Sequence, residues 1–421
     1  MKKIVGMGAA VALAASMFAA EPVANPQVLE FKGNASVEWG VDLDAGKTGF
    51  KNAQEASIKV KLFDGGDKAT SGSGVWAELK IVADTKDNEY KNEDEGSVNI
   101  KAPKVDTAKI HFNNFYVGIL KGDTQTGALT FTRAIKSGDN NNGKLLSDVG
   151  PADYTQGIVA GYDDSNFGVA VDFRSAKAAQ YTNDYALAAE ATLKDSNEYL
   201  SGLEVKGGYS YEFADKPLMG YSGSVAYKAT ISGDYYVKPA FGYTGTSKDG
   251  TTTNMIAGAL MFGWGDTADA NAGVYFLDDD AAKKVTPGVS VSYEKDLESD
   301  ANYGEIEAAF YLGKLVENLK AAALFSTTLV KEVNDTPIKV LAGCAYDVKA
   351  DEITITPKAG VLFANKAPGD EIKVKAGVDV AGLISNTTFY AVYASNNLKA
   401  DENKADENKI GTLNVGCKIA F

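Results

Sequence analysis

The final segment of the chain, Leu413 to Phe421, constrains the fold more than any other stretch. Because side chains of an extended strand alternate between its two faces, the segment predicts a strand with one apolar face, formed by Leu413, Val415, Cys417, Ile419 and Phe421. An edge strand exposes unpaired backbone groups and promotes aggregation, whereas closing the sheet into a barrel removes its edges. The segment therefore favours a closed β-barrel, with the last strand of an ordinary β-sandwich as the alternative.

An alternating apolar strand that ends in Phe also resembles the C-terminal signal by which outer-membrane barrels are recognised for assembly. This resemblance implies the outer-membrane assembly machinery as a partner, with Leu413, Val415, Cys417, Ile419 and Phe421 as the assembly signal. A location in the cell outer membrane, with its lipid bilayer as a further partner, is the corresponding expectation.

The opposite end of the chain predicts export. Lys2 and Lys3 precede an apolar segment, Ile4 to Ala15, that is too short to span a bilayer, and Ala19 and Ala20 offer a cleavage site. We expect a signal peptide at residues 1–20 and a barrel at residues 21–421. Beyond the signal, the best apolar run is 255–262, far shorter than the roughly 18 residues of a membrane-spanning helix.

Composition agrees with a barrel and excludes some partners. The chain contains 43 Gly, 21 Tyr and 18 Phe but only 10 Pro, which suits many strands joined by tight turns and flanked by aromatic residues. The net charge of −14 argues against nucleic acid or anionic lipid headgroups as main partners. Arg133 and Arg174 are the only arginines, so a bidentate phosphate-binding cluster is not expected.

Apolar and charged residues alternate along most of the chain. In 37–43, 56–62, 75–81 and 167–174, one face of each expected strand is apolar and the other carries charges. The whole pass predicts an all-β fold, a single antiparallel transmembrane β-barrel of about 18 to 20 strands. Pro239 is expected to interrupt one of these strands, because proline lacks a backbone N–H.

The connections in the last third predict how the barrel is oriented. They are expected to be long at 396–408, short at 382–385, longer at 364–370, short at 348–351 and longer at 328–337. Alternating short turns and long loops is typical of bacterial barrels, with the long loops outside the cell. A tandem repeat, 400–404 followed by 405–409, would shift the register of a strand, so we interpret it as an exposed loop tip. A short solvated helix cap on that loop is the alternative.

Several short blocks near the N-terminus resemble the treponemal major outer sheath protein family, which includes the Treponema pallidum repeat proteins. The resemblance covers residues 29–120 and rests on 37–43, 49–51, 75–79, 108–111 and Tyr116. It implies an outer-membrane porin and surface antigen, with adhesion to the host extracellular matrix in some members. Thr48 and the segment 112–114 depart from the family pattern, which affects the expected adhesion specificity more than the fold.

Candidates for chemistry in the sequence favour structural roles. His111 is the only histidine and lies in an expected strand beside Phe112, so a structural role is favoured over a hydrolase or metal site. The acidic run 278–280 lacks the spaced ligands of a calcium loop, and Gly72-Ser73-Gly74 lacks the rest of a phosphate-binding loop. We expect no catalytic residues, no metal site and no cofactor. Cys344 and Cys417 are expected to be free thiols, with a disulfide as the alternative.

Charged side chains on the second face of the strands indicate a hydrated interior. So many ions buried without water would be prohibitively costly, and a barrel of this size is wide enough to hold water. The pore-lining candidates are Glu38, Asp42, Lys59, Lys61, Glu78, Lys80, Arg133, Lys136, Asp172, Arg174, Lys373, Lys375 and Asp379. Arg133, Lys136 and the connection 137–151 are expected either to narrow the pore or to point outward.

The leading hypothesis is a porin for passive diffusion of small hydrophilic solutes, with mild cation preference. The alternatives are a host-matrix adhesin that uses the barrel as an anchor and a soluble secreted β-sandwich. A homo-trimer is left open.

Overall fold

The structure, a computed structural model, describes residues 28–64, 75–84, 104–121, 135–136, 154–176, 185–214, 216–265, 268–269, 284–311, 316–329, 338–366, 369–399 and 409–420. Every regular element in these ranges is a β-strand. None of the ranges contains a helix long and apolar enough to cross a membrane. Features that the sequence predicts outside the described residues are the signal peptide at 1–20, Gly72–Gly74, Arg133, the connection 137–151, the strand near 270–277, the acidic run 278–280, most of the tandem repeat and Phe421.

The wall is one closed antiparallel barrel, which confirms the predicted fold class. It contains 22 strands that occupy 20 positions around the wall. β11 and β12 share one position because both pair with β13, and β20 and β21 share another because both pair with β22. In order the wall contains β1 (Val28–Asp42), β2 (Lys47–Asp64), β3 (Val75–Asp84), β4 (Lys104–Phe112), β5 (Phe115–Lys121), β7 (Tyr154–Asp163), β8 (Phe167–Ala176), β9 (Tyr185–Leu193), β10 (Leu203–Phe213), β11 (Leu218–Tyr227), β12 (Ala229–Ser232), β13 (Tyr235–Lys248), β14 (Thr251–Trp264), β17 (Gly288–Asp296), β18 (Asn302–Tyr311), β19 (Leu319–Leu329), β20 (Ile338–Tyr346), β21 (Val348–Ala350), β22 (Ile353–Lys366), β23 (Gly369–Ala381), β24 (Thr387–Ala394) and β25 (Thr412–Ala420).

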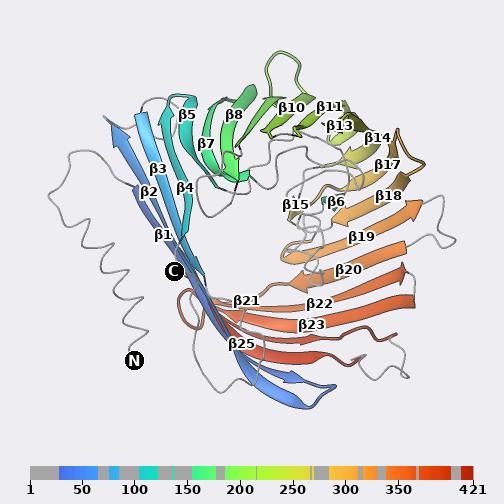
Figure 1. The fold of residues 1–421 in the computed structure, drawn as a ribbon. Coiled ribbons are helices and arrows are strands. Elements are labelled where there is room, and N and C mark those ends of the chain that lie inside the picture. The colour runs from blue at the N-terminus through green and yellow to red at the C-terminus, as the bar shows by residue number, and fades with distance from the viewer. Residues whose placement is uncertain are drawn as a thin grey trace.

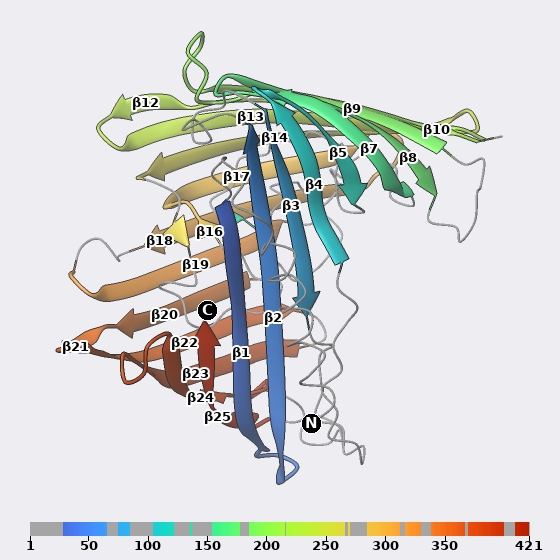
Figure 2. The same ribbon diagram turned by 90° about the vertical axis from the view of Figure 1, so that its left-hand side faces the viewer.

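The barrel closes where its first and last strands pair, a contact we call the seam. β1 and β25 run antiparallel with Val41 opposite Leu413 and Val37 opposite Cys417. Figure 1 shows the blue first strand and the red last strand side by side, and Figure 2 shows β1 and β25 from the seam side. The terminal segment therefore has a partner on both edges, β24 and β1, as expected for a closed sheet.

The wall has an apolar outer face and a polar inner face. On β8, Val171 and Phe173 are each 43% exposed, whereas Asp172 between them is 1% exposed and Arg174 is 4% exposed. β17 repeats the pattern, with exposed Val289, Val291 and Tyr293 alternating with buried Ser290, Ser292 and Glu294. Because strand residues alternate faces, these values assign the apolar set to the outside and the polar set to the inside.

Aromatic rings gather on the outer face near both rims. Near one rim, Tyr235 stacks on Phe262 at 6.1 Å between ring centroids, and Trp264 lies 5.6 Å from Phe310. Near the other rim, Phe173 stacks on Tyr185 at 5.2 Å. Two aromatic belts around an apolar band are the pattern that membrane–water interfaces select in outer-membrane barrels.

Three sequence-based expectations about the strands are wrong. The connection expected at 348–351 is mostly strand, because Val348–Ala350 form β21 and pair with β22. Pro239 does not interrupt its strand, since it lies within β13 opposite Leu260. Its missing N–H instead coincides with the break between β11 and β12 on the neighbouring side, where pairing with β13 stops at Ala226 and resumes at Ala229. The connection expected at 364–370 is only the pair 367–368, because β22 and β23 stay paired through their polar ends to Lys366 and Gly369.

Candidate functional site

The candidate site is the inner surface of the barrel, where polar and charged side chains from most of the wall converge. Among the described residues, buried polar side chains on the wall strands include Asp172, Arg174, Ser210, Ser224, Thr244, Ser290, Ser292, Glu294, Glu305, Glu307 and Glu371. Few of them belong to the predicted set, because serine, threonine and glutamate spaced two residues apart are common on any solvated strand face.

Among the predicted residues, Asp172 and Arg174 form the most enclosed contact. They lie two residues apart on β8 and share its inner face, with Arg174 Nε 2.6 Å from Asp172 Oδ1 and Nη2 2.9 Å from Oδ2. This bidentate geometry is the one that a guanidinium and a carboxylate favour. One of the two arginines of the chain is thus held flat against the wall by its neighbour.

A second group of predicted residues lies on β22 and β23. Lys358 Nζ lies 2.6 Å from Asp379 Oδ2, and Lys373 Nζ lies 2.5 Å from Glu371 Oε1. Lys375 follows on the same inner face and is half-buried. The sequence predicted Lys373, Lys375 and Asp379 but missed two of their partners. Lys358 lies on the neighbouring strand and is brought to Asp379 by the register, whereas Glu371 lies two residues before Lys373 on the same strand.

Four of the predicted residues on the second and third strands lie directly opposite one another. Lys59 is opposite Lys80, and Lys61 is opposite Glu78, across the β2–β3 pair. Asp42 lies at the end of β1 and its Oδ1 accepts hydrogen bonds from the backbone N–H groups of Asp44 and Ala45, both at 3.0 Å. Asp42 therefore stabilises the hairpin at the rim, which is a structural role that the sequence analysis did not assign to it.

Glu38 lies at the seam and meets a tyrosine that the sequence did not single out. The hydroxyl of Tyr390 on β24 donates to Glu38 Oε2 at 3.0 Å. The intervening residue on β25 is Gly416, opposite both Tyr390 and Glu38 in the register. Since Gly416 has no side chain, the tyrosine ring can lie across β25 and reach the first strand.

A pocket of about 690 Å³ opens on the inner wall formed by β4, β5 and β7 to β10. Its lining carries charges of both signs, including Lys109, Glu190, Glu204 and Lys206. The Lys109 ammonium lies 4.7 Å from the centre of the Tyr116 ring, and His111 packs beside the same ring at 5.8 Å. His111 contributes to this wall as an aromatic neighbour of Tyr116.

The rim next to the seam carries an anchored turn. Asp44, in the β1–β2 hairpin, accepts backbone hydrogen bonds from Lys409, Ile410 and Gly411, at 2.9, 2.8 and 2.7 Å. Desolvation raises the pKa of the Asp44 carboxyl, but these N–H groups together outweigh it and hold the pKa below its ordinary value of 3.8. The turn fixes the residues just before β25 to the first hairpin of the barrel.

Lys136 lies inside the barrel rather than on the wall. It belongs to β6 (Ile135–Lys136), which joins β16 (Lys284–Val285) and β15 (Ala268–Asp269) in a separate three-stranded sheet. Figure 1 shows β6 and β15 within the ring of strands. Arg133 and the connection 137–151, for which inward and outward were the alternatives, lie outside the described residues.

The described residues contain no group of three or more His, Cys, Asp or Glu side chains that could hold a metal ion. Cys344 and Cys417 are both free thiols, as expected. Cys417 lies between Val415 and Ile419 on the outer face of β25, where both of these neighbours are exposed.

Two treponemal proteins are similar to this chain over all or most of their length. The major outer membrane protein MspA of Treponema maltophilum is 28% identical, with the match covering 100% of both chains. The major surface protein MspTL of Treponema lecithinolyticum is also 28% identical, with 92% of each chain covered. No protein-family model matches the sequence.

Among solved structures, OccAB1 of Acinetobacter baumannii has 13% sequence identity and a TM-score of 0.45, with 94% of this chain and 96% of that chain covered. OccD3 (OpdP) of Pseudomonas aeruginosa has 11% identity and a TM-score of 0.45, with 93% and 91% covered.

Proposed function

Because this chain belongs to the treponemal major outer sheath protein family and is an outer-membrane β-barrel, we propose that it is a porin for the passive diffusion of small hydrophilic solutes. The observation that carries the proposal is the division of the closed wall into an apolar outer face and an ionic inner face. The proposed pore-lining residues are those of the inner face, among them Glu38, Lys80, Asp172, Arg174, Lys373, Lys375 and Asp379.

Hydration of the interior follows from the cost of burying charge. Burying an isolated carboxylate or ammonium in a dry, apolar centre is unfavourable by many kcal/mol. A partner of opposite charge compensates this cost only in part. The described inner wall carries partly exposed ion pairs on β10, β22 and β23, and each is retained more cheaply beside water. A wall of 20 positions also encloses more space than its own side chains fill, which supports a water-filled path.

Reconstitution of the folded protein into planar lipid bilayers tests this function. We expect stepwise increases in current as single barrels insert, with conductance that rises in proportion to salt concentration. A heat-unfolded sample of the same preparation is the control, since only the folded barrel should insert. Folded protein that inserts into the bilayer without any current step would reject the pore.

The ion preference of the pore is proposed to be mildly cationic. The chain carries 56 acidic against 42 basic side chains, and the buried inner residues include Glu294, Glu305 and Glu307 on two neighbouring strands. A wall with excess negative potential raises the local concentration of cations. Under a salt gradient the reversal potential should favour cations, and a reversal potential of the opposite sign would contradict the proposal.

A second candidate function is adhesion to the host extracellular matrix, with the barrel as an anchor. Two observations favour a surface role: one relative is named a major surface protein, and the residues before β25 are fixed to the β1–β2 hairpin by Asp44. Deleting residues 401–408 should abolish binding to matrix proteins and leave the conductance unchanged. Undiminished matrix binding by the deleted protein would exclude that segment as the adhesive element.

A further inference from the structure

Three short strands of the chain pair with one another instead of joining the wall. β16 is the central strand, with Lys284 opposite Lys136 of β6 and Val285 opposite Ile135. On its other edge, Val285 is opposite Ala268 and Lys284 is opposite Asp269 of β15. In Figure 1 this small sheet lies within the ring, on the side of β14 and β17 to β19. We call it the inner sheet.

The inner sheet joins segments that leave the wall at opposite mouths of the barrel. β6 belongs to the connection between β5 and β7, and β15 and β16 belong to the connection between β14 and β17. In an antiparallel wall, successive connections alternate between the two rims. β5 occupies the fifth position and β14 the twelfth, so the two connections start at different rims. Their pairing therefore joins a connection that starts at one mouth to a connection that starts at the other.

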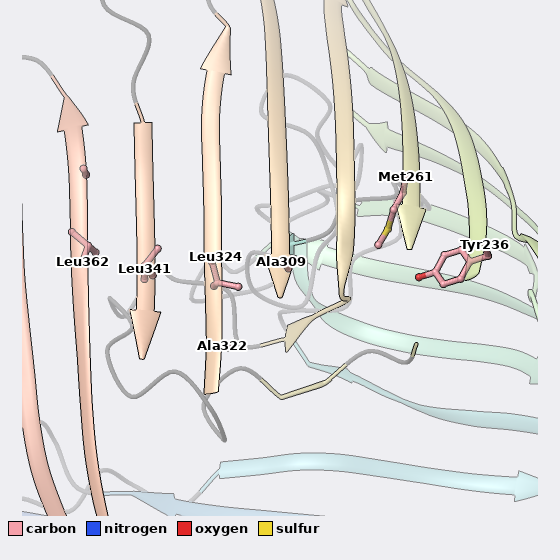
Figure 3. Packing of buried hydrophobic residues seen from close by; sticks show 8 residues of the cluster. Tyr236, Met261, Ala309, Ala322, Leu324, Leu341 and Leu362 are labelled. Carbon is pink, nitrogen blue, oxygen red and sulfur yellow. The ribbon is translucent and has the colours of Figure 1, made fainter. Parts of the chain in front are cut away.

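The wall beside the inner sheet carries a cluster of buried apolar residues on its inner face. The residues of this inner apolar patch are Tyr236, Met261, Ala309, Ala322, Leu324, Leu341, Leu362 and Ala364. Ala309, Leu324, Leu341 and Leu362 are opposite one another in turn across β18, β19, β20 and β22. Figure 3 shows the larger side chains of the patch on these successive strands.

Burial of the patch indicates that its inner face is covered. Leu324 is 2% exposed and Leu362 is 1% exposed, although both belong to a wall only one sheet thick. Residues of the same strands on the outer face, such as Phe310 at 46%, remain exposed. β6 lies in contact with β18, the strand that carries Ala309. The apolar patch and the inner sheet are thus neighbours within the lumen.

We infer that the inner sheet is a brace seated against the inner apolar patch, and that it restricts solutes to the polar remainder of the inner wall. The patch stabilises the brace through removal of apolar surface from water, and the pairing of β6 with β16 fixes it from both mouths. This inference rests on the proposed porin function, which it deepens by assigning the constriction.

Engineered disulfides test the brace itself. In a Cys344→Ala, Cys417→Ala background, the pairs Ile135→Cys/Val285→Cys and Lys136→Cys/Lys284→Cys occupy adjacent opposed positions of an antiparallel pair. One of two adjacent opposed pairs is the closer, non-hydrogen-bonded type, so at least one should oxidise readily in the folded barrel. Lys136→Cys with Lys349→Cys on β21 is the control that should stay reduced. Absence of a disulfide from both test pairs would overturn the brace.

Conductance tests the constriction separately. Ile135→Asp places a charge at a paired apolar position of the brace and should raise single-channel conductance roughly twofold, because conductance grows with the open cross-section of a hydrated pore. Val285→Asp, on the opposed strand, should give the same rise in conductance and replaces Ile135→Asp if that variant folds poorly. Unchanged conductance in folded variants would reject the constriction. A disulfide that forms in a barrel without any conductance would instead reject the porin function and leave the brace standing.

Discussion

Tyr390 and Glu38 are joined by a hydrogen bond of 3.0 Å that crosses the seam between the two ends of the chain, 352 residues apart in sequence. The ring of Tyr390 lies over Gly416 of the last strand, and the hydroxyl reaches the first strand. The seam is therefore fixed on its inner face by a side chain as well as by the backbone ladder of β1 and β25.

Removing the hydroxyl of Tyr390 should weaken closure of the barrel. Tyr390→Phe is expected to lower the free energy of unfolding by about 0.5–1.5 kcal/mol, the usual net value of one hydrogen bond. Urea unfolding in lipid vesicles, followed by tryptophan fluorescence, measures the loss. Tyr227→Phe on the outer face is the matched control. Equal stability of Tyr390→Phe and the wild type would show that this contact does not stabilise the seam.

A side chain at Gly416 should disturb the seam more strongly. A Cβ atom there would lie 2.5 Å from the Val37 carbonyl oxygen and 2.7 Å from the Tyr390 hydroxyl, so Gly416→Ala should cost about 1–3 kcal/mol through overpacking. At Gly258 a Cβ atom would meet nothing within 4 Å. The heat-modified mobility shift on gels should therefore occur at lower temperature for Gly416→Ala than for Gly258→Ala. A lower transition temperature for Gly258→Ala than for Gly416→Ala would contradict the close packing of Tyr390 and Val37 around Gly416.

The Asp44 anchor should make stability depend on pH. Its pKa is lower in the folded protein than in the unfolded chain, so its contribution is present above the unfolded value of 3.8 and is lost as pH falls through the folded value. The midpoint of thermal unfolding of the wild type should exceed that of Asp44→Asn at neutral pH. The two midpoints should converge as the pH falls below 3.8 and the carboxyl of the folded protein becomes protonated. A difference that persists in acid would assign the effect to something other than this charge.

The buried pair on β8 should be intolerant of single substitutions. Arg174→Met leaves the carboxylate of Asp172, 1% exposed, without its bidentate partner, and we expect a loss of about 3–5 kcal/mol. The double variant Asp172→Asn, Arg174→Met should recover much of that loss, because no uncompensated charge remains. Chemical unfolding of the two variants and the wild type measures both effects. Additive losses in the double variant would indicate that the two residues act independently.

Local alternation was enough to predict the class of fold and the face on which a residue lies. Leu413, Val415 and Ile419 are exposed on the outer face of β25, and Asp172 and Arg174 lie on the inner face of β8, as period two requires. The strand count was also within the predicted span, because each strand carries its own pattern and turn residues separate the strands.

The contacts between strands could not be predicted in the same way. The partner of Glu38 is Tyr390, and Lys358 is the partner of Asp379, because closure and register bring them together. No local pattern encodes either. The inner apolar patch was missed for a related reason: Leu324 and Leu362 are apolar residues on the face expected to be polar, and the register across β19, β20 and β22 brings them into one cluster.

Cysteine modification during current recording tests the hydrated inner face most directly. In the Cys344→Ala, Cys417→Ala background, Lys375→Cys on the inner face of β23 and Ala376→Cys on its outer face differ by one residue. A cationic, water-soluble thiol reagent should react at position 375 and reduce the single-channel current, and should leave position 376 unmodified in the bilayer. Lack of reaction at 375, or reaction without any change in current, would contradict a water-filled path along the inner wall.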